Sequence, residues 1–186
     1  MIFYRVFSWD GSSQGRNEGG PLYVPKSRQG SGRHDNPELY GAVYCSMDPV
    51  ACIAEALQPF RNQIVEERDL RRRPRSNLAL VQLQFDDRLP ICDLDEPKEL
   101  SRRRLRPSRV ATLDRRLTQE VAAGLFRDGF AGFLWWSVLE SLWINATLFA
   151  ERAETALVVT ADPRELHLTN EEVAAAARRL GVRLVR

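Results

Sequence analysis

The chain has 186 residues, of which 44% are hydrophobic and 28% are charged, and its formal net charge is only +2. This composition excludes a disordered chain, and the length predicts one domain over residues 1–186 with a single core. The charge is uneven, because residues 68–116 hold fourteen basic and eight acidic side chains while both flanking regions are mildly acidic.

The first predicted element is a strand over residues 2–7, in which Arg5 is the one charged member. A charged side chain in so apolar a run lies at a sheet edge or reaches into a polar site. Residues 8–37 follow as a long loop rich in Gly, Ser, Pro and Asn. Loops of this length are usually functional or disordered, and the arginine at position 33 near its end favours a function.

Residues 30–57 combine a glycine-rich loop, a short strand and a helix. Gly30 and Gly32 allow the loop backbone to approach a ligand closely. Asp48 and Pro49 predict an N-cap followed by the first helical residue.

Three polar residues in this stretch, Arg33, Tyr44 and Glu55, are separated by eleven positions each. We expect them to bring an arginine, an aromatic ring and a carboxylate to one cleft. Glu55 points away from the apolar stripe of its helix, which by itself suits a solvated glutamate. The residues around it on that face favour a cleft because they are small and uncharged: Ala51, Cys52 and Ala56.

The middle of the chain alternates between strands and helices. The charge run of residues 66–76 is predicted to be a solvated connection, and the strands that follow span residues 78–85 and 91–94. A helix is predicted from Asp95 through Leu105, with an arginine cluster at residues 102–109.

Thr118 is predicted to cap a helix over residues 119–128, which Gly129 closes. The run of residues 130–136 is apolar enough for a central strand, and it places Ser137 at its end. Ser137 has a simpler alternative role as the cap of the next turn.

Residues 129–150 resemble a membrane span in hydropathy, but Glu140 near the middle favours a buried strand plus helix instead. No secretory signal is recognisable at the N-terminus. The protein is therefore predicted not to be embedded in a membrane.

The last predicted elements are a strand at residues 157–159, a helix that starts in a capping box at residues 169–172 and ends at Gly181, and a strand at residues 182–185.

The three cysteines, Cys45, Cys52 and Cys92, include no CxxC pair and lie in apolar surroundings. They predict buried reduced thiols and a cytoplasmic location. His34 and His167 are the only histidines, which are too few for a zinc site, and no carboxylates have calcium-loop spacing. No metal is expected.

Arg33, Glu55 and Ser137 lie in the segments GSGRHDNP, YCSMDPVACIAEAL and GFAGFLWWSVLESLWINATLF. Together with the opening FYRV, the ICDLDEP segment from Ile91, and Asn145, this order resembles the RES domain of bacterial toxin–antitoxin systems. The resemblance covers most of the chain.

The resemblance implies an α/β (α+β) fold like that of ADP-ribosyltransferases, with compact mixed or antiparallel sheets flanked by helices. It implies degradation of NAD, with inorganic phosphate as co-substrate and no further cofactor. The products would be nicotinamide and ADP-ribose 1″-phosphate, or ADP-ribose if water attacks. Transfer of ADP-ribose to a protein is the alternative within the same fold.

The resemblance also assigns roles to individual residues. It implies catalytic roles for Arg33, Glu55 and Ser137. It implies roles in binding NAD for Arg5, Arg33, Tyr44 and Asn145. Such a site suits the chemistry, because a carboxylate stabilises an oxocarbenium-like cation and guanidiniums bind a pyrophosphate. The chain departs from the family pattern at three positions: Val6 in place of a tyrosine found in some members, and His34 and Asp35 in place of tryptophan and asparagine.

The family resemblance implies a homodimer that a Xre-type antitoxin inhibits, with nucleic acid contacted only through the antitoxin. A second alternative is a non-enzymatic nucleic-acid-binding protein that uses the arginines of residues 71–75 and 102–109. These clusters lack the interleaved aromatic residues and the groove-binding motif that such proteins usually have.

Overall fold

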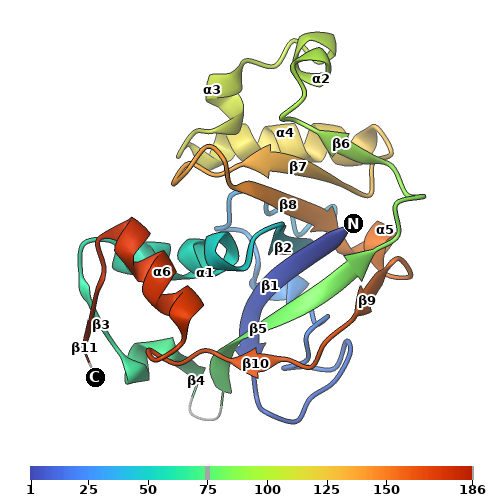
Figure 1. The fold of residues 1–186 in the computed structure, drawn as a ribbon. Coiled ribbons are helices and arrows are strands. Elements are labelled where there is room, and N and C mark those ends of the chain that lie inside the picture. The colour runs from blue at the N-terminus through green and yellow to red at the C-terminus, as the bar shows by residue number, and fades with distance from the viewer. Residues whose placement is uncertain (74–75, 186) are drawn as a thin grey trace. The chain divides into compact units, whose positions relative to one another are not determined.

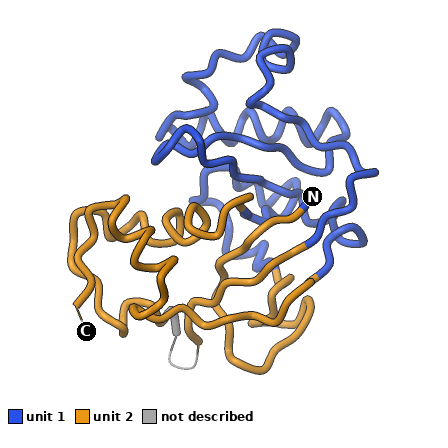
Figure 2. Tube along the Cα trace, viewed as in Figure 1, with its two compact units in different colours: residues 1, 24–45, 84–158 blue, residues 2–23, 46–83, 159–186 orange. Residues whose placement is uncertain are grey.

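A computed structural model describes residues 1–73 and 76–185. The chain divides into two compact units, each assembled from separate stretches of sequence (Figure 2). Unit 1 comprises Met1, residues 24–45 and residues 84–158, and unit 2 comprises residues 2–23, 46–83 and 159–186. The elements of both are labelled in Figure 1.

Unit 1 is built on four strands in the order β2 (Ala42–Ser46), β8 (Ile144–Phe149), β7 (Gly132–Trp136) and β6 (Ile91–Asp93). β7 pairs antiparallel with β8 and parallel with β6. The long helix α4 (Arg115–Arg127) packs against β7 and against the short helix α3 (Pro107–Val110). The remaining helices of the unit are η1 (Lys26–Arg28), α2 (Pro97–Arg102) and α5 (Ala150–Ala153).

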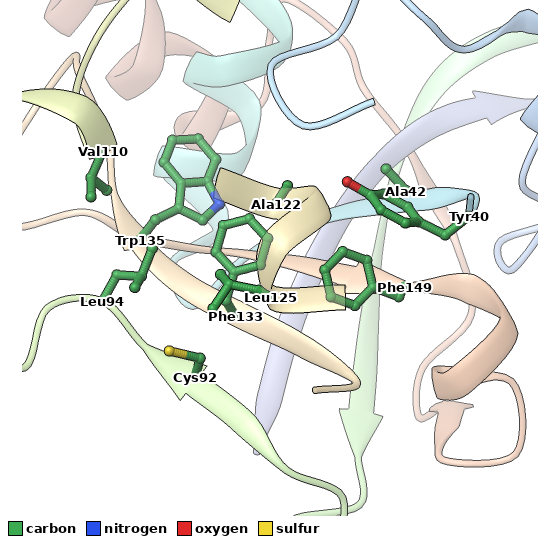
Figure 3. Packing of buried hydrophobic residues seen from close by; sticks show 10 residues of the cluster. All are labelled: Tyr40, Ala42, Cys92, Leu94, Val110, Ala122, Leu125, Phe133, Trp135 and Phe149. Carbon is green, nitrogen blue, oxygen red and sulfur yellow. The ribbon is translucent and has the colours of Figure 1, made fainter. Parts of the chain in front are cut away.

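The core of unit 1 forms between β7 and α4 because both elements carry large apolar side chains at facing positions (Figure 3). Phe133 and Trp135 of β7 are buried together with Ala122 and Leu125 of α4. Phe149 from the end of β8 completes an aromatic contact with Phe133, at 5.9 Å between ring centroids. Residues on both faces of β7 are buried, which explains why the run predicted at residues 130–136 is apolar throughout.

Unit 2 is built around β1 (Ile2–Trp9) and β5 (Ser76–Phe85), which are neighbours in the sheet. β5 also pairs with three short strands: β4 (Arg71–Arg73), β9 (Leu157–Val159) and β10 (Arg164–Glu165). Helix α1 (Pro49–Leu57) packs against β1 and α6 (Glu171–Leu180). In a separate two-stranded sheet, β3 (Ile64–Glu66) pairs parallel with β11 (Arg183–Val185). The 3-10 helices of this unit are η2 (Gln58–Phe60) and η3 (Glu67–Leu70).

Most local signals in the sequence are confirmed. The Asp48 side chain caps α1 by accepting a hydrogen bond from the Ala51 amide at 2.8 Å, and Gly181 ends α6 with a left-handed φ of 67°. All three cysteines are free and buried. The predicted α/β class is also confirmed.

The predicted start of α4 is wrong. The N-cap is Asp114, whose carboxylate accepts hydrogen bonds from the amides of Arg116 and Leu117. Thr118 lies inside the first turn and is 1% exposed. The predicted helix over residues 95–105 is also shorter, because α2 stops at Arg102 and Arg104 takes a left-handed φ of 51°.

The prediction of a strand followed by a helix for residues 129–150 is wrong, because β7 and β8 form an antiparallel hairpin there. No helix in the described part of the chain is long and apolar enough to cross a membrane. α6 is capped at Asn170 without a side-chain hydrogen bond, so the predicted capping box at residues 169–172 is absent. The run of residues 66–76 holds η3 and β4 instead of a plain connection, and its residues 74–75 lie outside the described chain.

Candidate active site

The loop that carries Arg33 is organised by the carboxylate of Asp35. Asp35 Oδ2 accepts hydrogen bonds from the amides of Gly30 at 2.8 Å and Gly32 at 2.6 Å. A Cβ atom at Gly32 would lie 2.6 Å from both carboxylate oxygens, so only glycine fits this approach. The glycines were predicted to admit a ligand, but at Gly32 the close neighbour is Asp35.

The other side of the loop is held by the first turns of α4. Gln119 Nε2 donates to the carbonyl oxygens of Gly32 at 2.9 Å and Gly30 at 3.2 Å. The Thr118 hydroxyl donates to the Arg33 carbonyl oxygen, and Arg115 donates to that of Ser31. Because both the amides and the carbonyls of the loop are bonded, the backbone at Arg33 has a defined position.

The Arg33 side chain lies on the face of Trp135, with 5.2 Å between the guanidinium carbon and the ring centroid. Its Nη1 donates to the carbonyl oxygen of Thr112. A planar guanidinium stacked on an aromatic ring keeps a fixed orientation, and its fork of N–H groups matches the geometry of planar anions. The half-buried Arg33 is thus suited to bind a carboxylate or a phosphate.

Tyr44 and His34 pack beneath this loop. The Tyr44 hydroxyl donates to Asp35 Oδ1 at 2.7 Å and accepts from the His34 amide at 2.9 Å. The two rings are stacked with centroids 6.1 Å apart. Burial, and then the neighbouring Asp35 carboxylate, raise the pKa of Tyr44, so its hydroxyl stays protonated. Tyr44 therefore offers a neutral aromatic surface and not a base.

His34 is 2% exposed and lies among the side chains of the central strands. Its Nδ1 is 2.8 Å from the Thr147 hydroxyl oxygen, which also accepts a hydrogen bond from Trp135 Nε1 at 3.1 Å. Burial lowers the pKa of His34 well below its ordinary value, and the positive charge of Arg33 lowers it further. His34 is therefore neutral, and it supports the tryptophan on which Arg33 rests.

Ser137 and Asn145 lie on the β7–β8 hairpin. Ser137 is 2% exposed, and its Oγ accepts a hydrogen bond from the Leu139 amide at 3.0 Å. This contact confirms the alternative that Ser137 caps the following turn. Asn145 is 1% exposed and lies opposite Trp135 in the antiparallel register. Unit 1 thus contains four of the six predicted site residues: Arg33, Tyr44, Ser137 and Asn145.

Arg5 belongs to unit 2, where it is 8% exposed. Its Nη1 and Nη2 each donate a 2.7 Å hydrogen bond, to the carbonyl oxygens of Pro21 and Tyr23. β1 has β5 on one side and pairs with β2 at Tyr4 and Ser46, so the sheet-edge interpretation of Arg5 is wrong. Arg5 holds the middle of the long loop in place.

Glu55 is half-buried on α1, also in unit 2. Ala51 is fully buried, and Cys52 is 6% exposed with its thiol 3.2 Å from the Tyr4 carbonyl oxygen. Packing against β1 and α6 therefore explains the small residues near Glu55. Their size no longer supports a cleft, and the role of Glu55 rests on the family comparison.

Sequence reasoning missed several residues that build the site in unit 1. Asp35 stood out only as a departure from a family pattern, although Asp is a frequent turn residue because its side chain can bond nearby backbone amides. Thr118 was assigned to a helix cap. Gln119 and Thr147 were not singled out, because their partners in the loop, Gly32 and His34, lie more than 80 residues away along the chain.

Among residues 1–73 and 76–185, no group of three His, Cys, Asp or Glu side chains is arranged to hold a metal ion. The arrangement in unit 1 offers instead a guanidinium stacked on a tryptophan, an aromatic surface and neutral hydrogen-bonding groups. These features suit an anionic ligand that carries a flat ring.

The fold and this arrangement define a class: a mixed α/β protein in which a glycine-loop arginine rests on a tryptophan of the central strand. The RES domain family matches residues 2–170, and the chain belongs to this family. The matched range includes all six predicted site residues. A search of curated proteins found no match.

The fold is also similar to a solved structure. A chain from the crystal structure of the M. tuberculosis MbcT–MbcA toxin–antitoxin complex matches with a TM-score of 0.65 and 18% sequence identity. The match covers 97% of the present chain and 88% of the other chain. At this identity the likeness concerns the fold.

Proposed function

We propose that this protein is the toxin of a toxin–antitoxin pair and that it degrades NAD. The observation that carries the proposal is the RES family match, which spans every predicted site residue from Arg5 to Asn145. The similarity to a chain of the MbcT–MbcA toxin–antitoxin complex supports it. The described contacts of Arg33 support it further, because NAD offers a pyrophosphate for a guanidinium and flat rings for aromatic surfaces.

The proposed reaction breaks the bond between nicotinamide and ribose. Nicotinamide leaves as a neutral base, and the ribosyl carbon develops positive charge that the Glu55 carboxylate stabilises. Inorganic phosphate then attacks this carbon, which yields ADP-ribose 1″-phosphate. Arg33, with Arg5 and Asn145, would bind the dinucleotide, and Tyr44 would face the nicotinamide end. Ser137 would complete the site.

The test is product analysis by mass spectrometry after mixing the full chain with NAD, with and without phosphate. We expect nicotinamide together with ADP-ribose 1″-phosphate, at a rate that saturates with phosphate concentration. Plain ADP-ribose at every phosphate concentration would assign a glycohydrolase instead. Label from NAD that ends on protein would assign the ADP-ribosyltransferase alternative.

Glu55→Gln should abolish this turnover because it removes the negative charge at nearly constant size. Glu171→Gln is the matched control, since Glu171 is exposed in the first turn of α6. Equal activity of both variants and the wild type would contradict the catalytic role of Glu55. Inhibition by EDTA would contradict a reaction that needs no metal.

The partners follow from the same assignment. We expect a cytoplasmic homodimer and an inhibitory Xre-type antitoxin, through which any contact with nucleic acid would occur. Light scattering of the purified chain tests the dimer. Relief of growth arrest by a co-expressed neighbouring gene tests the antitoxin, and arrest that no neighbouring gene relieves would contradict it.

A further inference from the structure

A hollow of about 250 Å³ lies in unit 1 between residues 103–109 and α4. Arg103, Arg104 and Arg109 contribute to its wall, together with the acidic residues Glu120 and Asp128 and apolar surface from Leu105 and Val121. None of the six predicted site residues lines it. The residues of α4 that bond the Arg33 loop, Arg115, Thr118 and Gln119, do not line the hollow.

Gly124 is the first sign that this hollow accommodates a ligand. It lies inside α4, where glycine is less favourable than alanine. A Cβ atom at Gly124 would meet nothing within 4 Å, so packing does not require glycine there. The open space above this residue is part of the hollow. A group that approaches the helix backbone at this point would explain why the position lacks a side chain.

Arg104 is the second sign. It follows the end of α2 with a φ of 51°, a conformation that favours glycine. Its exposed guanidinium forms no hydrogen bond or ion pair with any residue in the described ranges. An arginine at a backbone position suited to glycine, with its charge uncompensated, indicates that the side chain is needed for an interaction.

The fixed position of Arg103 and Arg109 is the third sign. The Nε atoms of Arg103 and Arg109 have no hydrogen-bond partner in the described structure. Arg103 Nε is 3.6 Å from a Glu99 oxygen, which is too long for a hydrogen bond. The remaining bonds of both side chains hold them in place, because Arg103 donates to Asp128 and Arg109 to Glu120.

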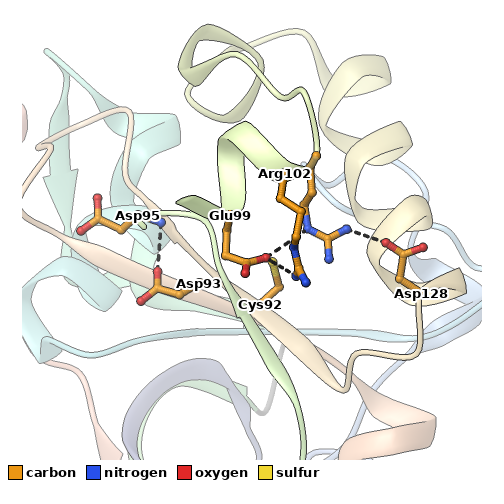
Figure 4. Close-up of polar contacts among 7 residues, drawn as sticks. Cys92, Asp93, Asp95, Glu99, Arg102 and Asp128 are labelled. Atoms are coloured by element: carbon orange, nitrogen blue, oxygen red, sulfur yellow. Dashed lines mark hydrogen bonds and ion pairs between the residues drawn. The ribbon is translucent and has the colours of Figure 1, made fainter. Parts of the chain in front are cut away.

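The surrounding ion pairs keep the acidic residues occupied. Figure 4 shows Glu99 paired with Arg102, and Asp128 bonded to a second guanidinium. Arg103 also stacks on Phe130, at 4.9 Å from the ring centroid. The hollow therefore presents the guanidinium of Arg104, unpaired among the described residues, beside two guanidiniums that Asp128 and Glu120 hold in place, next to apolar surface.

We propose that this hollow binds a small phosphorylated ligand with a flat ring, of the nucleoside monophosphate class. The phosphate would be bound by Arg104 and Arg109, because guanidiniums bind phosphate oxygens bidentately. The ring would lie over Gly124 against Leu105 and Val121. The volume of about 250 Å³ is just below the usual range of ligand sites, which limits the ligand to the size of a mononucleotide or smaller. This site is independent of the proposed NAD reaction.

The experiment is a titration of the full chain, labelled with ¹⁵N-arginine, with AMP. Arg103→Lys and Arg109→Lys assign the Nε–H signals of these two residues. Both signals should shift and saturate with AMP, and inorganic phosphate should bind at least tenfold more weakly. Shifts that are absent, or that sodium chloride reproduces at equal ionic strength, would overturn the proposal. Phosphate that binds as tightly as AMP would overturn the placement of the ring.

Two variants separate binding from stability. Gly124→Ala fills the space over the helix, and Arg104→Gly relieves the backbone, so each should weaken AMP binding tenfold or more. Neither should lower Tm, and each is expected to raise it by roughly 2–4 °C. Arg61→Ala, at an exposed position of unit 2, is the control and should change neither quantity. Unchanged affinity in Gly124→Ala, or displacement of AMP by a polyglutamate peptide, would refute this ligand class.

Discussion

At the residue scale, Asp35 has the largest share in the geometry of the Arg33 loop. One carboxylate accepts hydrogen bonds from Gly30, Gly32 and Tyr44, and Asp35 is 6% exposed. We expect Asp35→Ala to lower the free energy of unfolding by about 2–4 kcal/mol, because buried donors lose a charged acceptor. Urea denaturation measures this loss. Glu38→Ala, an exposed neighbour, should stay within about 0.5 kcal/mol of wild type, and an equal loss there would contradict the assignment.

Arg33 is expected to affect activity far more than stability. Arg33→Ala should reduce NAD turnover by about a hundredfold or more, since one lost positioned charge costs about 3 kcal/mol in the barrier. The variant also loses the stacking on Trp135 and the bond to Thr112, so the free energy of unfolding should fall by roughly 1–2 kcal/mol. Initial rates and urea denaturation check both numbers, with Arg61→Ala as the control. A variant that retains full activity would remove Arg33 from the site.

His34 predicts acid sensitivity of the fold. Burial lowers its folded-state pKa below the value of 6.5 that it has when unfolded, so the unfolded chain binds the proton more readily. Its contribution to stability is complete above pH 6.5. Below pH 6.5 stability falls by up to about 1.4 kcal/mol per pH unit until the folded-state pKa is reached.

The measurement is the free energy of unfolding at pH 7, 6 and 5 for the wild type and for His34→Asn. The variant should show a smaller decrease with acid, whatever its absolute stability. His167→Asn is the control, because His167 is exposed. This variant should keep most of the acid-induced decrease in unfolding free energy. Equal slopes in the wild type and His34→Asn would show that His34 is not the group responsible.

At the element scale, the start of α4 positions the Arg33 loop. Because the helix begins after Asp114, Thr118 and Gln119 fall on turns that reach the loop carbonyls. Asp114→Ala should destabilise the protein by about 1 kcal/mol through loss of the cap. Thr169→Ala should have almost no effect, since the predicted capping box there is absent. Thermal denaturation of the two variants measures the difference. A larger loss of stability in Thr169→Ala than in Asp114→Ala would contradict the observed helix starts.

At the scale of the whole molecule, the two compact units are interleaved along the sequence. Neither unit is one continuous stretch, because the chain passes between them several times. The expectation of a single domain over residues 1–186 therefore stays a prediction with a clear test. We expect one cooperative unfolding transition, with equal calorimetric and van't Hoff enthalpies. Two separated transitions would show that the units are independent domains.

The sequence by itself determined the local elements and the family. Asp48 and Gly181 mark helix ends through contacts with nearby residues, and the apolar run before Ser137 is readable as a central strand. These signals are local, since caps and periodicity depend on neighbours a few positions away. The RES motifs were readable for the same reason, because each lies within a short segment.

Tertiary structure alone decided how the site residues are held. Arg5 bonds carbonyls 16 and 18 positions away, and Gln119 reaches a loop 87 positions away. Thr147 joins His34 to Trp135, a contact that the motif containing Thr147 does not reveal. Such pairings depend on which strands and helices become neighbours, and the periodicity of a single segment contains no information about its partner. The sequence therefore named Arg33, and only the fold shows that Asp35, Gln119 and Trp135 fix its position.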